Sequence, residues 1–128
     1  MIGFCRSDVK LNRLPGWEAG AWGYHGDDAH TFCGSGIAKI YGPTCTTGDH
    51  IGCCLNFREG IAFYTKNGVQ LATAFRSLRP DEEDKDLYPT VGLRSPAEHI
   101  RGNFGTEPFM FDIDASVGVD DYVMVGFQ

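Results

Sequence analysis

Residues 51–75 read IGCCLNFREGIAFYTKNGVQLATAF. Apolar side chains recur there at every second position, which is the period of a strand with one buried face. This happens in three runs, 51–57, 61–65 and 69–75. The first break, 58–60, ends in glycine, and the second is Asn67-Gly68. Asn-Gly favours the type I′ turn of a two-residue hairpin, because both residues tolerate positive φ. The stretch therefore predicts a three-stranded antiparallel meander.

Glycine and proline interrupt the rest of the chain too often for a helical fold. The 128 residues include 17 glycines and 6 prolines, and the longest stretches free of both, 4–14 and 69–79, have 11 residues. Helices of globular proteins average about 11–12 residues, so a helical bundle has no room here. Aromatic residues make up 12% of the chain and cluster between the glycines. We therefore predict a single all-β domain, an antiparallel sandwich or barrel.

Shorter apolar segments predict further strands outside the meander. They lie at Ile2–Cys5, Tyr88–Leu93, His99–Phe104, Phe109–Ile113 and Tyr122–Phe127. Residues 79–86 read RPDEEDKD, and this run predicts a solvated surface loop, because its like charges repel one another and are costly to bury.

The net charge and the lack of long apolar runs argue against nucleic-acid-binding and membrane-spanning proteins. The chain has 11 basic and 17 acidic residues and a net charge of −6, which opposes binding to the phosphates of nucleic acids. No apolar run approaches the roughly 18 residues of a membrane-spanning helix, and the first residues lack the basic and apolar regions of a signal peptide. We therefore expect an intracellular protein that binds neither nucleic acid nor membrane, with its five cysteines as free thiols.

The polar cluster at 24–30, YHGDDAH, admits two interpretations. With the distant His99, His25 and Asp27 imitate the two-histidine, one-carboxylate iron site of non-haem oxygenases. The other interpretation is that Asp27 and Asp28 hydrogen-bond the backbone of a tight loop. We favour the second, because a protein with four histidines offers some such triad by chance.

Other catalytic signatures are weak in this sequence. Ser35 lacks the Gly-x-Ser-x-Gly pattern of a nucleophile elbow. Cys33 could pair with His30 or His50, but no local signature supports a catalytic dyad there. No glycine-rich loop precedes a predicted helix, as a phosphate site would need. The sequence therefore predicts a protein without enzymatic activity, metal or cofactor.

Five aromatic residues in the glycine-rich first third suggest recognition instead. They are Trp17, Trp22, Tyr24, Phe32 and Tyr41. Taken singly, each favours a core position. Aromatic side chains on rigid loops nevertheless give a large contact area at a small entropic cost, so we expect one or two of the group to face a partner.

Several longer motifs follow one another in a fixed order. They are LPGWE at 14–18, WGYHGDD at 22–28, YGP at 41–43, TTGDxIGC at 46–53, FYTKNG at 63–68, LYPTVGL at 87–93 and NFGxxPFxFDI at 103–113. Together they resemble the SPRY domain of the Ran-binding protein M family, including its fungal relatives in the GID (CTLH) ubiquitin ligase. The resemblance predicts a domain at 1–113 and a tail at 114–128.

The resemblance implies a β-sandwich of two antiparallel sheets that binds proteins through loops at one edge, without catalysis. Full-length relatives resemble scaffold subunits of an E3 ubiquitin ligase, cytoplasmic and also nuclear, which in fungi directs gluconeogenic enzymes to the proteasome. The partners would be peptides or other ligase subunits. By similarity, the partner-facing loops map onto Tyr24–Phe32 and Leu93–Glu98. The expected contact residues are Tyr24, His25, Asp27, Asp28, Phe32, Arg94 and Ser95.

The chain also departs from the family pattern. Family members have strands before the position of Ile2, and after Ile113 they continue into helical LisH and CTLH segments. Ala29 and Ala72 replace common glycines, and Cys45 replaces an aromatic residue. We therefore expect a domain that lacks its N-terminal strands and has a free sheet edge, in a chain that is a fragment, a truncated gene model or a divergent paralogue.

Overall fold

The computed structural model describes residues 1–76, 78, 86–116 and 122–127. In these ranges the chain forms ten strands and one short helix, in two compact units. The first unit comprises Met1–Thr46 and Pro80–His99, and the second comprises Thr47–Arg79 and Ile100–Gln128. Each unit contains one five-stranded sheet with antiparallel neighbours. The predicted all-β fold with two antiparallel sheets is confirmed.

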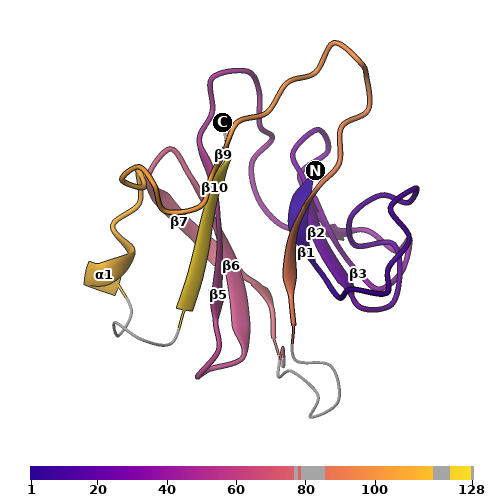
Figure 1. The fold of residues 1–128 in the computed structure, drawn as a ribbon, viewed down its shortest axis with the longest axis horizontal. Helices are drawn as coiled ribbons and strands as arrows, with labels where there is room; N and C mark the ends of the chain where they lie inside the picture. The colour runs from indigo at the N-terminus through magenta and orange to yellow at the C-terminus, as the bar shows by residue number, and fades with distance from the viewer. Residues whose placement is uncertain (77, 79–85, 117–121, 128) are drawn as a thin grey trace. The chain divides into compact units, whose positions relative to one another are not determined.

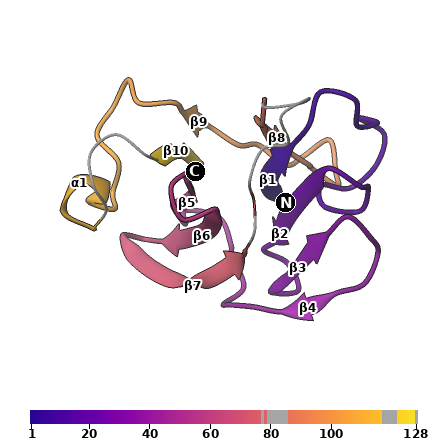
Figure 2. The ribbon, with the colours of Figure 1, turned by 90° about the horizontal axis from the view of Figure 1, so that it is seen from below.

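The sheet of the first unit has the order β4-β3-β2-β1-β8 (Figure 2). Its strands are β1 (Ile2–Cys5), β2 (Ala21–His25), β3 (His30–Cys33), β4 (Lys39–Ile40) and β8 (Tyr88–Val91). Strands β1 and β2 approach closely where Gly3 faces Gly23. A Cβ on Gly3 would lie 1.8 Å from the carbonyl oxygen of Trp22, so this pairing requires glycine.

The sheet of the second unit has the order β7-β6-β5-β10-β9 (Figure 1). Its strands are β5 (Ile51–Asn56), β6 (Ile61–Lys66), β7 (Val69–Phe75), β9 (Gly102–Asn103) and β10 (Tyr122–Phe127). Strands β5 to β7 are the predicted meander. Asn67 and Gly68 have φ values of 51° and 82°, as a type I′ turn needs. The register between β6 and β7 shifts at two places, so this outermost strand is bulged.

The second unit buries a compact apolar cluster against its sheet. Phe63 and Phe111 meet edge to face, with ring centroids 6.0 Å apart, a favourable geometry for aromatic pairs. Cys54 of β5 and Phe63 of β6 are direct partners in the sheet, so their side chains lie on one face. The cluster consists of Cys54, Phe63, Phe111, Ile113 and Met124, with Phe109 packed against it.

The predicted strand at Phe109–Ile113 is wrong. Phe111 and Ile113 are buried, as the alternating pattern required, but the segment pairs with no strand among the described residues. The helix α1 (Ile113–Ser116) begins at its end. Apolar alternation fixes which side chains are buried, whereas a strand also requires a partner for its backbone.

Other strands differ in length or were missed. The predictions at Tyr88–Leu93 and His99–Phe104 shorten to β8 and β9, and β2, β3 and β4 were not predicted. Strand β10 pairs with β5 and β9, so part of the segment 114–128 contributes to the sheet. The acidic run at 79–86 lies outside the described residues except for Asp86. No helix in the described part of the chain is long and apolar enough to span a membrane.

Candidate protein-docking site

The tip of the β2–β3 hairpin presents two carboxylates to solvent. The backbone N–H of Ala29 donates to the His25 carbonyl at 2.9 Å, and Ala29 takes a φ of 64°. Asp28 Oδ1 accepts the backbone N–H of His30 at 3.1 Å. Asp27 and Asp28 are exposed. Asp28 therefore stabilises a tight loop, as one of the two sequence interpretations proposed.

Tyr24 holds a second segment, 41–45, against this tip. Its side chain is only 1% exposed, and its hydroxyl donates to the Pro43 carbonyl. The backbone N–H groups of Tyr41 and Cys45 donate to the carbonyls of Ala29 and Gly26, at 3.0 and 2.7 Å. Burial raises the pKa of Tyr24, which keeps the hydroxyl protonated as a donor. These hydrogen bonds fix the hairpin tip to segment 41–45.

His25 and Phe32 form the support on the other side of the hairpin. Both are buried, and their ring centroids are 4.2 Å apart. His25 Nε2 lies 2.8 Å from the Pro15 carbonyl; because a carbonyl can only accept, Nε2 carries the proton. Burial lowers the pKa of His25, although the bond to Pro15 opposes this shift. Phe32 also contacts the Trp17 ring, with centroids 6.0 Å apart.

A compact turn at Arg94–Glu98 lies next to the hairpin tip. Its backbone is closed by Glu98 Oε2, which accepts the Arg94 N–H at 2.7 Å, and by Ser95 Oγ, which accepts the Ala97 N–H at 3.2 Å. Arg94 Nη1 lies 2.6 Å from Asp27 Oδ2, and this ion pair joins the two loops. We call the exposed residues Asp27, Asp28, Arg94 and Ser95 the rim.

The structure divides the seven predicted contact residues into two groups. The four rim residues are exposed and lie in two adjoining loops. The other three, Tyr24, His25 and Phe32, are buried and their rings fill space beneath the loops; their contact with a partner stays a prediction. The roles of Pro15 and segment 41–45 had no sequence signal, because they act through backbone carbonyls and N–H groups.

The iron-site interpretation loses its third ligand. Donor atoms of His25, Asp27 and Asp28 lie within 4.8 Å of one another, but His99 does not belong to this group. The two carboxylates already have partners: Arg94 pairs with Asp27, and the backbone N–H of His30 donates to Asp28. The tip is accounted for as a hydrogen-bonded loop with an ion pair.

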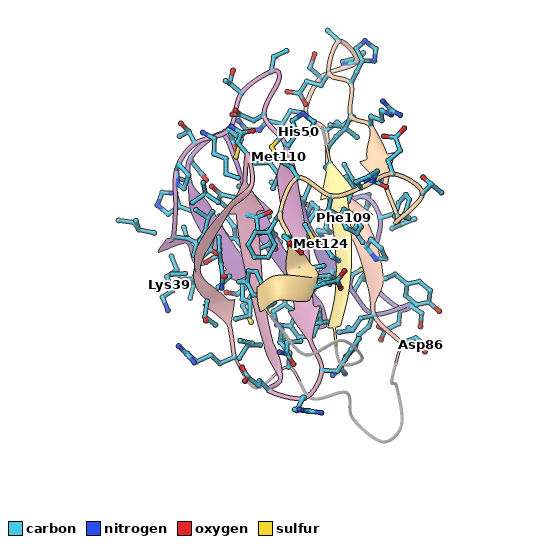
Figure 3. All side chains as sticks on the ribbon, turned by 90° about the vertical axis from the view of Figure 1, so that its left-hand side faces the viewer. Lys39, His50, Asp86, Phe109, Met110 and Met124 are labelled. Atoms are coloured by element: carbon cyan, nitrogen blue, oxygen red, sulfur yellow. The ribbon has the colours of Figure 1, made fainter. Side chains whose placement is uncertain are left out.

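A small cavity also lies in the second unit. Its volume is about 90 Å³, well below the about 300–1,000 Å³ of ordinary ligand pockets. Phe109, Met110 and Met124 line it together with His50, near β10 (Figure 3). It lies beside the apolar cluster and is too small for an ordinary ligand.

Comparison with known proteins identifies the fold family. The sequence model of the SPRY domain family matches residues 1–107 of the chain. The chain belongs to the SPRY domain family. The SPRY chain is also similar to a crystal structure of a human SPRY domain, with a TM-score of 0.56 and 26% sequence identity over 69% of this chain and 56% of that one.

The relatives that this SPRY chain is similar to include three Ran-binding proteins. It is 55% identical to Ran-binding protein 9 of Xenopus laevis over 113 residues and 54% identical to the Homo sapiens protein of that name. It is 38% identical to the Ran-binding protein M homolog of Arabidopsis thaliana over 112 residues. Each alignment covers 88% of this chain, but only 20%, 15% and 23% of those proteins. The chain thus spans about a fifth of their length, and as a SPRY domain it is a protein-interaction module.

Proposed function

We propose that this SPRY domain serves a scaffold subunit of a GID/CTLH-type E3 ubiquitin ligase, in the cytoplasm and also the nucleus, and binds a partner protein through the rim. The partner is a peptide of a substrate or a neighbouring ligase subunit. In this role the domain performs no chemistry; it places the bound protein within reach of the ligase.

The observation that carries this proposal is the ion pair between Arg94 and Asp27 at 2.6 Å. Both side chains are largely exposed, so the pair itself contributes little stability, about 0–1 kcal/mol. Its two loops are separately closed by hydrogen bonds, and together they present charged groups on rigid supports. Rigid loops lose little entropy on binding, which favours recognition.

The similarity to Ran-binding proteins supports the choice of partner class. The identity of 54–55% covers the segments that build the rim, because the alignments extend over 113 residues. A rim of two short loops gives a small contact, and small contacts favour transient binding of about micromolar affinity.

The experiment exchanges the two charges of the ion pair. Asp27→Arg and Arg94→Asp are made singly and together, and each chain is tagged and co-expressed with the other ligase subunits. Glu107→Arg is the matched control, because Arg101 and Glu107 form another exposed ion pair, in the second unit. We expect both single variants to lose capture of the ligase subunits and the control to retain it.

The double variant separates contact from positioning. It restores the ion pair with the two charges exchanged. If the pair only holds the two loops together, the double variant recovers binding. If the two side chains contact the partner directly, the double variant does not bind. Full capture by both single variants would refute the proposal. So would failure of the unaltered chain to capture any ligase subunit while it unfolds cooperatively.

A further inference from the structure

The first unit also contains a cavity that none of the four rim residues lines. Its volume is about 390 Å³, within the about 300–1,000 Å³ range of ligand pockets. Residues of loop 9–18 line it, together with residues of β1 and β8. Its walls mix polar and apolar side chains, with Cys5, Leu11, Leu14, Trp17, Val91 and Leu93 among the apolar lining residues.

Two unpaired cations border this cavity. Lys10 and Arg13 line it and are exposed, and neither side chain has a carboxylate partner among the described residues. The one acidic lining residue is Glu18, whose Oε2 accepts the backbone N–H of Lys10 at 2.7 Å. Glu18 therefore closes the loop, and its negative charge offsets only one of the two cations. In a chain of net charge −6, this local excess of positive charge favours an acidic ligand.

Exposed apolar side chains extend the contact beyond the cavity. Leu11 is 89% exposed and Leu93 is 47% exposed, and Trp17 on the loop and Val91 on β8 are also partly exposed. Leu11 lines the cavity but is 89% exposed, so a small molecule confined to the cavity would leave most of this side chain uncovered. An extended peptide can place one side chain in the cavity and cover the neighbouring apolar surface at the same time.

We propose that this cavity binds an acidic peptide segment of a partner protein, with one bulky apolar side chain inserted among Leu14, Trp17 and Val91 and with neighbouring aspartate or glutamate residues paired to Lys10 and Arg13. This inference rests on the proposed protein-interaction function and adds the chemistry of the peptide that it recognises.

The probe is a phage-displayed library of random twelve-residue peptides, selected on the chain. Enriched peptides are expected to share a bulky apolar residue flanked by acidic residues. Lys10→Glu/Arg13→Glu should weaken the binding of an enriched peptide about tenfold, since two exposed ion pairs become repulsive. Val91→Trp should weaken it by filling the cavity.

Two controls match these variants. Lys39→Glu changes the charge of an exposed residue on β4 (Figure 3), and Ile40→Trp adds the same ring at a site that is 83% exposed. Both should bind the peptide like the unaltered chain. Thermal unfolding of every variant verifies that the first unit remains folded.

Several results would overturn the inference. These are a library that yields no enriched peptide, enriched peptides without acidic residues, or equal binding by the charge-reversed and unaltered chains. Self-association that is abolished by Lys10→Glu/Arg13→Glu would identify a second copy as the occupant instead. If capture of ligase subunits still depends on Asp27 and Arg94 in any of these cases, the proposed function stands while this inference fails.

Discussion

Replacing Phe32 by alanine should destabilise the first unit without removing any atom of the rim. Phe32 is 5% exposed and contacts the rings of His25 and Trp17. Withdrawing a large apolar side chain from the interior costs about 1.5–3 kcal/mol, and each aromatic contact adds about 0.5–1.5 kcal/mol. The sum is roughly 2.5–6 kcal/mol, and measured Phe→Ala losses are typically about 3–5 kcal/mol.

The assay is urea unfolding followed by tryptophan fluorescence, because Trp17 and Trp22 both lie in the first unit. Phe32→Leu is the matched variant and should lose less than about 1.5 kcal/mol, since most of the volume is kept. Its binding to a partner should equal that of the unaltered chain. The reasoning is refuted if Phe32→Ala costs less than about 1 kcal/mol while Phe32→Leu abolishes binding, because Phe32 would then be a contact residue.

Three further predictions concern the two sheets. Because the pKa of His25 is lowered from 6.5 in the folded chain, the unfolded chain takes up the proton first. The urea midpoint should therefore fall as the pH drops below about 6.5, and fall less in His25→Gln. Gly3→Ala should lower the free energy of unfolding by at least about 3 kcal/mol or prevent folding, because the added Cβ would meet a carbonyl oxygen of β2. The control Gly36→Ala adds a Cβ in open space and should unfold like the unaltered chain. A thiol reagent at neutral pH should modify the exposed Cys33 in the folded chain, and Cys54 only after unfolding, since burial raises the pKa of Cys54 to about 12. Mass spectrometry after digestion identifies the modified cysteine. Labelling of Cys54 in the folded chain would contradict its burial.

The meander was predictable because its information is local. Strict alternation and an Asn-Gly turn each act within a few residues, and both are present in 51–75. The β2–β3 hairpin was missed for the opposite reason. Its turn contains Ala29 at positive φ, which a non-glycine residue rarely adopts, and segment 41–45 holds the turn by hydrogen bonds from outside the hairpin.

The candidate site was predictable only in part. The motif WGYHGDD located the correct hairpin, and LYPTVGL led to the turn at Arg94. The sequence could not distinguish supporting from exposed residues within these motifs, because Tyr24 and Asp27 are three positions apart and their exposure depends on segments far along the chain. Pro15 contributes through its carbonyl oxygen, a group that every residue type carries.

The bulged strand β7 bears on how this protein behaves at high concentration. Its residues VQLATAF carry no charge and no proline, a composition that promotes the growth of intermolecular sheets into fibrils. Strand β7 is also the outermost strand of its sheet. The two register shifts against β6 twist this edge and break the regular row of donors and acceptors that an incoming strand would need. The irregular pairing thus protects β7 from aggregation, a protection that its uncharged side chains do not provide.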